Sequence, residues 1–323
     1  MLEAKSVDLV LEGGGVKGIG LLGAVLALYE AGHRFQRIAG TSAGAIVAAL
    51  VAAYQKDGRD LRQLVDVMHD LDYRRFAGEP WPQRAAGVLG DLVSGVVHGG
   101  SHKSDYLVEW LTPLLEDAGV RTFADLRIPD HGGSLEDYQK YSLVVHASDL
   151  TRRALVRLPW DYPSYGLKAD EQRVVDAVRA SISIPFYFRP IQVATERGTC
   201  TWVDGGLLAN FPITVFDRTD GEAARWPTWG VKLSGQPVPG EDRPVRTSPG
   251  IALSCLYTLT GDWNRHRLDR DGVNARTMFV DTGTVSPQDF HLSKSDQQML
   301  FESGQRAAHL FLEGLHPDHR LAG

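Results

Sequence analysis

Apolar residues in the first sixty positions alternate between short strand-like runs and longer helix-like stretches. A run of β-forming residues at 7–11 is followed by Glu12 and three glycines, which predicts a buried strand entering a tight turn. A helix is expected over 19–31, a second short strand over 37–41 and an alanine-rich helix over 43–54. Two strand–turn–helix units in succession favour a parallel sheet with helices on its faces.

The rest of the chain predicts further elements of the same α/β kind. Helices are expected at 60–71, at 104–118 with a kink or break at Pro113, at 172–181, near 251–268 and at 295–315. Strands are expected at 141–148, 153–158, 199–203, 229–233 and near 277–280. The segment 73–103 is rich in glycine and apolar residues, and we interpret it as an insertion that covers a site.

Composition and charge exclude several functional classes. The formal net charge of −6 and the pI near 6.0 provide no broad basic field for nucleic acid or for an anionic bilayer. Cys200 and Cys255 are too few for a disulfide framework or a metal site, which fits a reducing compartment. No secretory signal begins the chain, so a cytoplasmic location is expected, and signal-less secretion stays open as an alternative.

The segment from Gly40 to Gly44 matches the G-x-S-x-G pattern of a nucleophile elbow, with Ser42 at its centre. A strand is predicted before it and a helix after it, and this context is the one that the elbow requires. Flanking glycines let the strand and the helix approach closely, and the helix N-terminus favours a developing oxyanion. We therefore predict that Ser42 is a nucleophile; a role as a simple helix cap is the alternative.

A glycine-rich loop separates the first predicted strand from the first predicted helix. It consists of Gly13, Gly14, Gly15, Val16, Lys17 and Gly18. Backbone N–H groups in such a loop bind anions, so the loop could form an oxyanion hole, with Lys17 adding positive charge nearby. The loop also matches G-x-G-x-x-G and permits a dinucleotide-binding oxidoreductase, but residues 31–54 lack the acidic residue that such a site needs about 20 positions later.

A serine is a weak nucleophile at neutral pH and needs a base within hydrogen-bond reach. Asp204 ends a predicted strand and precedes Gly205 and Gly206. Because the carboxyl ends of strands in an α/β sheet converge on one edge, we expect Asp204 near Ser42. A Ser-His-Asp triad would instead use a late histidine, for which chain order alone allows His266, His291 and His309. None of these lies in a motif, and only one strand–turn–helix unit precedes Ser42.

Together, the glycine loop, the elbow and the Asp204-Gly205-Gly206 turn resemble the patatin-like phospholipase family. They occur in that family's order, each in its expected strand context. Supporting matches are Ala180, Ser181, Pro185, Asn210 and Pro212. The resemblance covers 6–235, and one departure is Lys17, where many members carry arginine.

The resemblance implies a three-layer α/β/α fold with a mainly parallel central sheet. Residues 6–235 would form the catalytic core, and 236–323 would be an extension packed on the same domain. The implied partners are phospholipids or other fatty acyl esters, with peripheral membrane contact and no nucleic acid. The oligomeric state is not indicated.

The implied reaction is hydrolysis of acyl esters by a Ser42–Asp204 dyad, with no catalytic histidine, metal or other cofactor. Ser42 would attack the ester carbonyl, and Asp204 would activate first Ser42 and then water. The oxyanion would be held by the N–H groups of Gly14, Gly15 and Val16. A catalytically inactive lipid-binding protein remains a further alternative.

Overall fold

The computed structural model describes residues 5–76, 103–130, 133, 135–185, 187–234, 272–287 and 289–315. The strands are β1 (Lys5–Leu11), β2 (His33–Thr41), β3 (Leu143–Asp149), β4 (Ala154–Leu158), β5 (Ile191–Thr195), β6 (Gly198–Asp204), β7 (Thr228–Ser234) and β8 (Thr277–Asp281). The α-helices are α1 (Gly18–Glu30), α2 (Ala43–Lys56), α3 (Leu64–His69), α5 (Lys103–Asp117), α6 (Val174–Ser181), α7 (Gly206–Ala209) and α9 (Lys294–Leu315). Short 3₁₀ turns include η1 (Gly15–Lys17), η2 (Leu61–Gln63), η3 (Tyr73–Phe76), η4 (Phe123–Leu126), η5 (Asp137–Gln139), η6 (Tyr162–Tyr165), η7 (Ala169–Glu171) and η8 (Asn274–Arg276).

The strands of the described residues form one mixed sheet in the order β5-β6-β3-β2-β1-β7-β8, with β4 also paired to β3. The neighbours from β3 through β2, β1 and β7 to β8 are all parallel. The pairs β3–β4, β3–β6 and β5–β6 are antiparallel. The predicted α/β class with a mainly parallel central sheet is therefore confirmed.

Strands β2 and β6 meet end to end beside β3. Thr41 of β2 lies opposite His146 of β3, and Asp204 of β6 lies opposite the next residue, Ala147. Strand β4 pairs with β3 at both positions, so β2 and β6 must share the other side of β3. Because β6 runs antiparallel to β2, the carboxyl ends of the two strands approach the same point from opposite directions. Asp204 thus reaches the elbow, but our expected reason, strands converging in parallel, was wrong.

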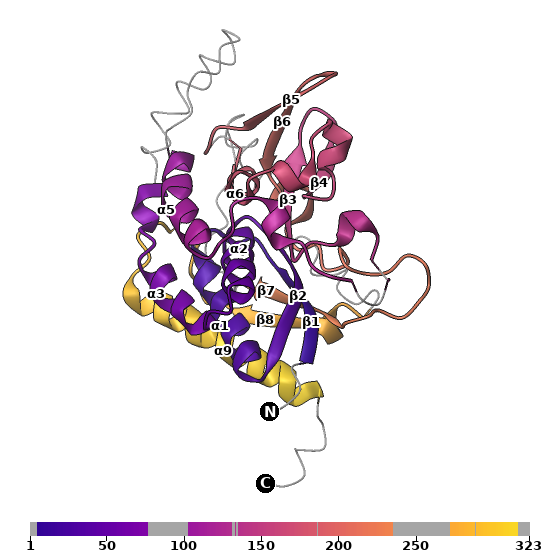
Figure 1. Cartoon of the computed structure of the whole chain (residues 1–323). Helices are drawn as coiled ribbons and strands as arrows, with labels where there is room; N and C mark the ends of the chain where they lie inside the picture. The colour runs from indigo at the N-terminus through magenta and orange to yellow at the C-terminus, as the bar shows by residue number, and fades with distance from the viewer. Residues whose placement is uncertain are drawn as a thin grey trace, which may run out of the picture.

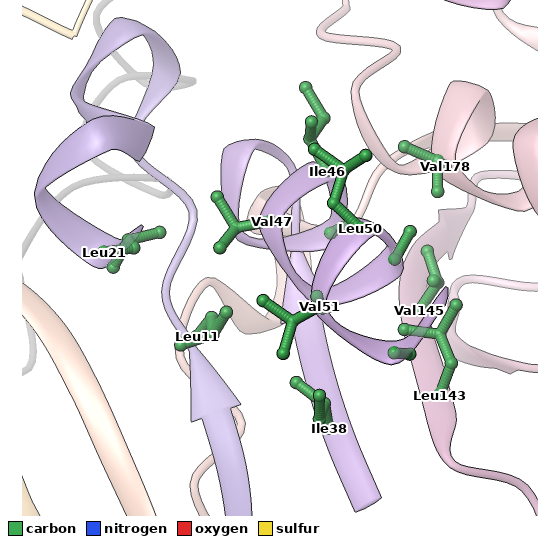
Figure 2. Close-up of a cluster of buried hydrophobic side chains, with 14 of the residues drawn as sticks. Leu11, Leu21, Ile38, Ile46, Val47, Leu50, Val51, Leu143, Val145 and Val178 are labelled. Atoms are coloured by element: carbon green, nitrogen blue, oxygen red, sulfur yellow. The ribbon is translucent and has the colours of Figure 1, made fainter. Parts of the chain in front are cut away.

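A layer of aliphatic side chains holds α2 against the sheet next to the elbow. Figure 2 shows Val51 of α2 close to Ile38 of β2, with Val145 of β3 and Val178 of α6 in the same cluster. All four side chains are 1% exposed or less. Alanine-rich α2 lies close to β2 because its small side chains leave little to separate the two backbones.

The C-terminal elements pack on the same body. Strand β8 extends the sheet beyond β7, and α9, yellow in Figure 1, lies along α1. The two helices are so close that a Cβ placed on Gly304 would lie 2.0 Å from the carbonyl oxygen of Gly20. Residues 272–315 thus contribute to the core around β1 and α1.

Some elements depart from expectation. Helix α5 continues through Pro113, because its buried leucines keep packing on the core after the proline removes one backbone bond. The stretch 60–71 divides into η2 and α3, and neither β5 nor α7 was predicted. The proposed cover at 73–103 lies outside the described residues except for 73–76 and Lys103, as does the helix expected near 251–268. Within the described ranges, no helix has the length and apolar character needed to cross a membrane.

Candidate active site

Ser42 occupies the sharp turn between β2 and α2. Its φ of 52° and ψ of −121° place it in a region that side-chain-bearing residues rarely adopt, at a cost of about 1–3 kcal/mol. The flanking glycines are required by close contact: a Cβ on Gly40 would lie 2.3 Å from the Gly44 carbonyl oxygen, and one on Gly44 would lie 2.5 Å from that of Leu11. The backbone itself therefore holds the serine at the start of α2.

Asp204 lies at the end of β6, and its carboxyl group interacts with the side chain of Ser42. Its carboxylate also accepts the Gly206 N–H at 2.7 Å, and the residue is only 4% exposed. Burial raises the pKa of this carboxyl to about 7, and the bonds from Ser42 and Gly206 only partly oppose that increase. A carboxylate with a pKa near neutrality suits a general base better than an ordinary aspartate does.

The end of α6 connects the two residues. The Ser181 hydroxyl oxygen accepts the Ser42 N–H at 2.9 Å, and two residues later the Ser183 carbonyl accepts the Asp204 N–H at 2.9 Å. Ser181 and Ser183 are both fully buried. One short segment therefore sets the spacing of the proposed nucleophile and base. Ser181 matches the family pattern, but nothing in the sequence indicates this role.

The glycine loop lies next to Ser42: a Cβ placed on Gly13 would lie 3.2 Å from the Cβ of Ser42. Three of its N–H groups already donate to carbonyl oxygens: Gly13 to Asn210 (3.1 Å), Val16 to Pro287 (3.1 Å) and Lys17 to Gly14 (3.2 Å). Among the described residues, the N–H groups of Gly14 and Gly15 meet no acceptor. The anion-binding capacity expected of this loop is therefore available at Gly14 and Gly15, whereas the Val16 N–H is engaged.

Asn210 joins the glycine loop to the turn that follows Asp204. Its carbonyl accepts from Gly13, and its side-chain amide donates back to the Gly13 carbonyl at 3.0 Å. The same amide lies 3.5 Å from Glu12, whose buried carboxylate pairs with Lys232 at 2.6 Å. The loop thus rests on a buried network of charged and polar groups.

Lys17 has a different environment from the one expected. Its ammonium group donates to the Thr282 hydroxyl at 3.0 Å and is only 7% exposed. Burial lowers the pKa of Lys17, with Glu12 partly opposing this. In this structure the Lys17 ammonium anchors the loop to the segment after β8.

No late histidine contacts Ser42 in the described part of the chain. His291 and His309 are exposed, and His266 lies outside the described residues. The histidine near the elbow is His146, whose Nδ1 lies 3.4 Å from the Gly40 carbonyl oxygen. Burial lowers the pKa of His146 to about 4, so it is neutral at physiological pH.

The described residues contain no cluster of histidine, cysteine, aspartate or glutamate that could hold a metal ion. Cys200 is a buried free thiol on β6, and Cys255 lies outside these residues.

Comparison with known sequences identifies the family. The sequence profile described as patatin-like phospholipase matches residues 9–217, which include the glycine loop, the elbow and Asp204. The chain belongs to the patatin-like phospholipase family. Its patatin-like region thus extends from β1 to beyond α7.

This patatin-like chain is similar to two relatives in sequence and to one solved structure in fold. The uncharacterized protein YqhO of Bacillus subtilis is 36% identical over 307 residues, which is 95% of this chain and 98% of YqhO. A cUMP-AMP-activated phospholipase of Escherichia coli is 28% identical over 253 residues, which is 72% of this chain and 66% of that protein. The crystal structure of VipD from Legionella pneumophila has a TM-score of 0.53 at 19% identity, covering 97% of this chain and 67% of that one. At this identity, VipD supports the fold alone.

Proposed function

We propose that this chain is a lipid acyl hydrolase of the phospholipase A or lysophospholipase type, acting through a Ser42–Asp204 dyad. The observation that supports this most directly is the interaction of a strained serine at a helix N-terminus with a buried carboxyl whose pKa is about 7. Family membership and the E. coli relative described as a phospholipase support the reaction class.

In the acylation half, Asp204 accepts the hydroxyl proton of Ser42 as its oxygen attacks the ester carbonyl. The carbonyl oxygen becomes negative and takes hydrogen bonds from the N–H groups of Gly14 and Gly15. The N-terminus of α2 stabilises the same charge. Protonated Asp204 then returns the proton to the departing alcohol, leaving an acyl group on Ser42.

In the deacylation half, a water molecule takes the place of the departed alcohol. Asp204 accepts one of its protons while the hydroxide adds to the acyl carbonyl, and the same two N–H groups stabilise the second oxyanion. Collapse releases the fatty acid and returns the proton from Asp204 to Ser42. A carboxyl group with a pKa near 7 can both accept and donate a proton at neutral pH, because its protonated and ionised forms then have similar free energies.

We favour a hydrolase over the two alternatives, a dinucleotide-binding oxidoreductase and an inactive lipid-binding protein. The family profile and the polar contact between Ser42 and Asp204 support a reacting pair. We also propose that 6–235 are the catalytic core and that 236–323 form an extension of the same domain, since β8 pairs with β7.

The proposal is tested with purified protein on vesicles of mixed phospholipids. We expect fatty acid release by the wild-type chain and none by Ser42→Ala, with mass spectrometry of the remaining lysolipids giving the acyl position. Dinucleotide binding without fatty acid release would instead favour the oxidoreductase alternative. Lipid binding without release would favour the inactive one.

A further inference from the structure

The glycine loop is contacted by a part of the chain that lies beyond the patatin-like region. The family profile ends at residue 217, whereas β8 begins at Thr277. Strands β1, β7 and β8 are parallel neighbours, so the loop after β1 and the segment after β8 leave the sheet at the same edge. Leu11 at the end of β1 lies level with Met278, and β8 continues beyond this level. Residues 282–287 therefore reach the loop where it enters α1.

Thr282 makes the first contact between this segment and the loop. Its hydroxyl oxygen accepts a hydrogen bond from the Lys17 ammonium group at 3.0 Å, and Thr282 is fully buried. Among the residues that the structure describes, no other acceptor bonds this ammonium group. A buried ammonium group without an acceptor is unfavourable, so this bond ties the side chain of Lys17 to the end of β8.

The carbonyl oxygen of Pro287 makes the second contact. It accepts the Val16 N–H at 3.1 Å, and a Cβ placed on Gly15 would lie only 1.9 Å from it. The Val285 N–H donates to the Thr282 carbonyl at 3.2 Å, so a turn joins the two contacts. The segment therefore holds the loop at two adjacent positions.

Both contacts lie next to the N–H groups that the proposed reaction uses. Lys17 donates its own N–H to the Gly14 carbonyl at 3.2 Å, which closes a turn within the loop. In the described part of the chain, the N–H groups of Gly14 and Gly15 meet no acceptor. Holding Val16 and Lys17 in place thus also restricts the orientation of these two N–H groups, since few backbone bonds separate them.

We propose that Thr282 is a positioning residue for the oxyanion hole, acting through its hydrogen bond with Lys17. This inference rests on the proposed hydrolase function, because that function makes Gly14 and Gly15 the oxyanion donors. Thr282 acts on the reaction only through the loop. If its hydroxyl is replaced by a methyl group, the buried ammonium group loses its acceptor and must either give up its proton or move toward water with the loop.

The first test is turnover of a soluble chromogenic ester by Thr282→Val, which keeps the shape of the side chain and removes the hydroxyl. We expect kcat to fall about tenfold and KM to change less than about twofold, because the oxyanion forms only after the substrate is bound. Thr282→Ser retains the hydroxyl and should keep kcat within about threefold of wild type. A kcat of Thr282→Val close to that of wild type, or an equal loss in both variants, would overturn the proposal.

Thr277→Val is the matched control at the opposite end of β8. Thr277 is buried, and its hydroxyl donates to the Val273 carbonyl at 2.6 Å. This variant should lose as much stability as Thr282→Val in urea denaturation, while its kcat stays within about twofold of wild type. A similar loss of kcat in the two valine variants would show that Thr282 acts only through stability.

A double-mutant cycle tests whether the effect passes through Lys17. If it does, the chain that carries both Lys17→Met and Thr282→Val should have the same kcat as Lys17→Met alone. Losses that multiply would contradict a role for this hydrogen bond.

Hydrogen exchange separates this inference from the proposed function, because it requires no substrate. The N–H groups of Gly13, Val16 and Lys17 all have acceptors, so a peptide that covers 13–18 should exchange slowly in the wild-type chain. Thr282→Val should accelerate this exchange at least about fivefold, and Thr277→Val should not. Accelerated exchange in a chain that hydrolyses no ester would refute the hydrolase but not the hold on the loop. Unchanged exchange in Thr282→Val would refute the positioning role, whatever the turnover.

Discussion

The two turns that bring Ser42 and Asp204 together are built in different ways. The elbow after β2 positions its residue through backbone strain: Ser42 has a φ of 52°, and Gly40 and Gly44 leave no space between strand and helix. Gly205, which follows Asp204, has an ordinary α-helical φ of −63°. The special property of Asp204 comes from burial, which raises its pKa. The nucleophile is therefore defined by local conformation and the base by its tertiary surroundings.

The largest effect is expected from removing the nucleophile. Ser42→Ala should lower turnover of a soluble chromogenic ester by at least about four decades, because no other hydroxyl occupies the strained turn. Far-UV circular dichroism and melting temperature should remain close to wild type, since alanine also fits the buried turn. Retained turnover with an intact fold would show that the strained turn is only structural.

Asp204→Asn should remove about three decades of turnover while keeping the shape of the side chain. His291→Gln and His309→Gln are the controls, and each should change turnover less than about twofold because both histidines are exposed. A histidine variant as inactive as Asp204→Asn would restore a triad.

Asp204→Asn should also change the free energy of unfolding, and the pKa of Asp204 predicts the direction of that change. Folded Asp204 holds its proton up to a pKa of about 7, whereas in the unfolded chain the carboxyl has its ordinary pKa of 3.8. Folding therefore favours the protonated form, and wild-type stability falls as pH rises from about 4 to about 7. Asparagine does not ionise, so Asp204→Asn does not lose stability in this way. It should be more stable than the wild-type protein at pH 8, measured by urea denaturation. A lower stability of Asp204→Asn at pH 8 would contradict the desolvated state of the base.

A smaller effect is expected at the base turn. A Cβ on Gly205 would lie 2.3 Å from the His146 carbonyl oxygen, so Gly205→Ala must displace the turn from β3. We expect about 10- to 100-fold lower turnover and about 1–3 kcal/mol lower stability by chemical denaturation. Gly314→Ala is the matched control, since nothing lies within 4 Å of its added methyl group. Equal behaviour of the two variants would show that the turn tolerates movement.

The smallest effect should come from the connection through α6. Ser181→Ala leaves the Ser42 N–H without its acceptor and should reduce turnover about tenfold with little change in KM. Ser303→Ala removes a similarly buried hydroxyl, bonded to the Asp281 carbonyl at 2.6 Å. It should lose comparable stability without losing turnover. A similar loss of turnover in both variants would mean that Ser181 acts only through stability.

The difference between the locally defined elbow and the base, which depends on its tertiary surroundings, explains what the sequence could predict. The strand, the sharp turn and the helix around Ser42 are local, so periodicity and the glycine spacing were enough to place them. The position of Asp204 beside Ser42 depends on the register of two strands on β3, and no local pattern contains that register. Strand β5 was missed because it alternates between partly buried and exposed residues at the sheet edge.

The supporting contacts also depend on the tertiary structure. Ser181 and Asn210 contact residues that are far away in the sequence. Ser181 lies 139 residues from its partner Ser42, and Asn210 lies 197 residues from its partner Gly13. The engagement of the Val16 N–H by Pro287 has the same long-range origin. A glycine-rich loop predicts anion binding in general, but the N–H groups that remain available depend on what packs against it.

The central claim is that Ser42 is activated by a carboxyl group whose pKa is raised to about 7 by burial. It is tested most directly by the rate at which a fluorophosphonate labels Ser42 between pH 5 and pH 9, followed by mass spectrometry of the tryptic peptide. Because Asp204 accepts the proton only when ionised, the rate should rise with pH and level off above a midpoint near 7. In Asp204→Asn it should be low and show no such midpoint. Labelling of another residue, or the same pH profile in both proteins, would contradict the account.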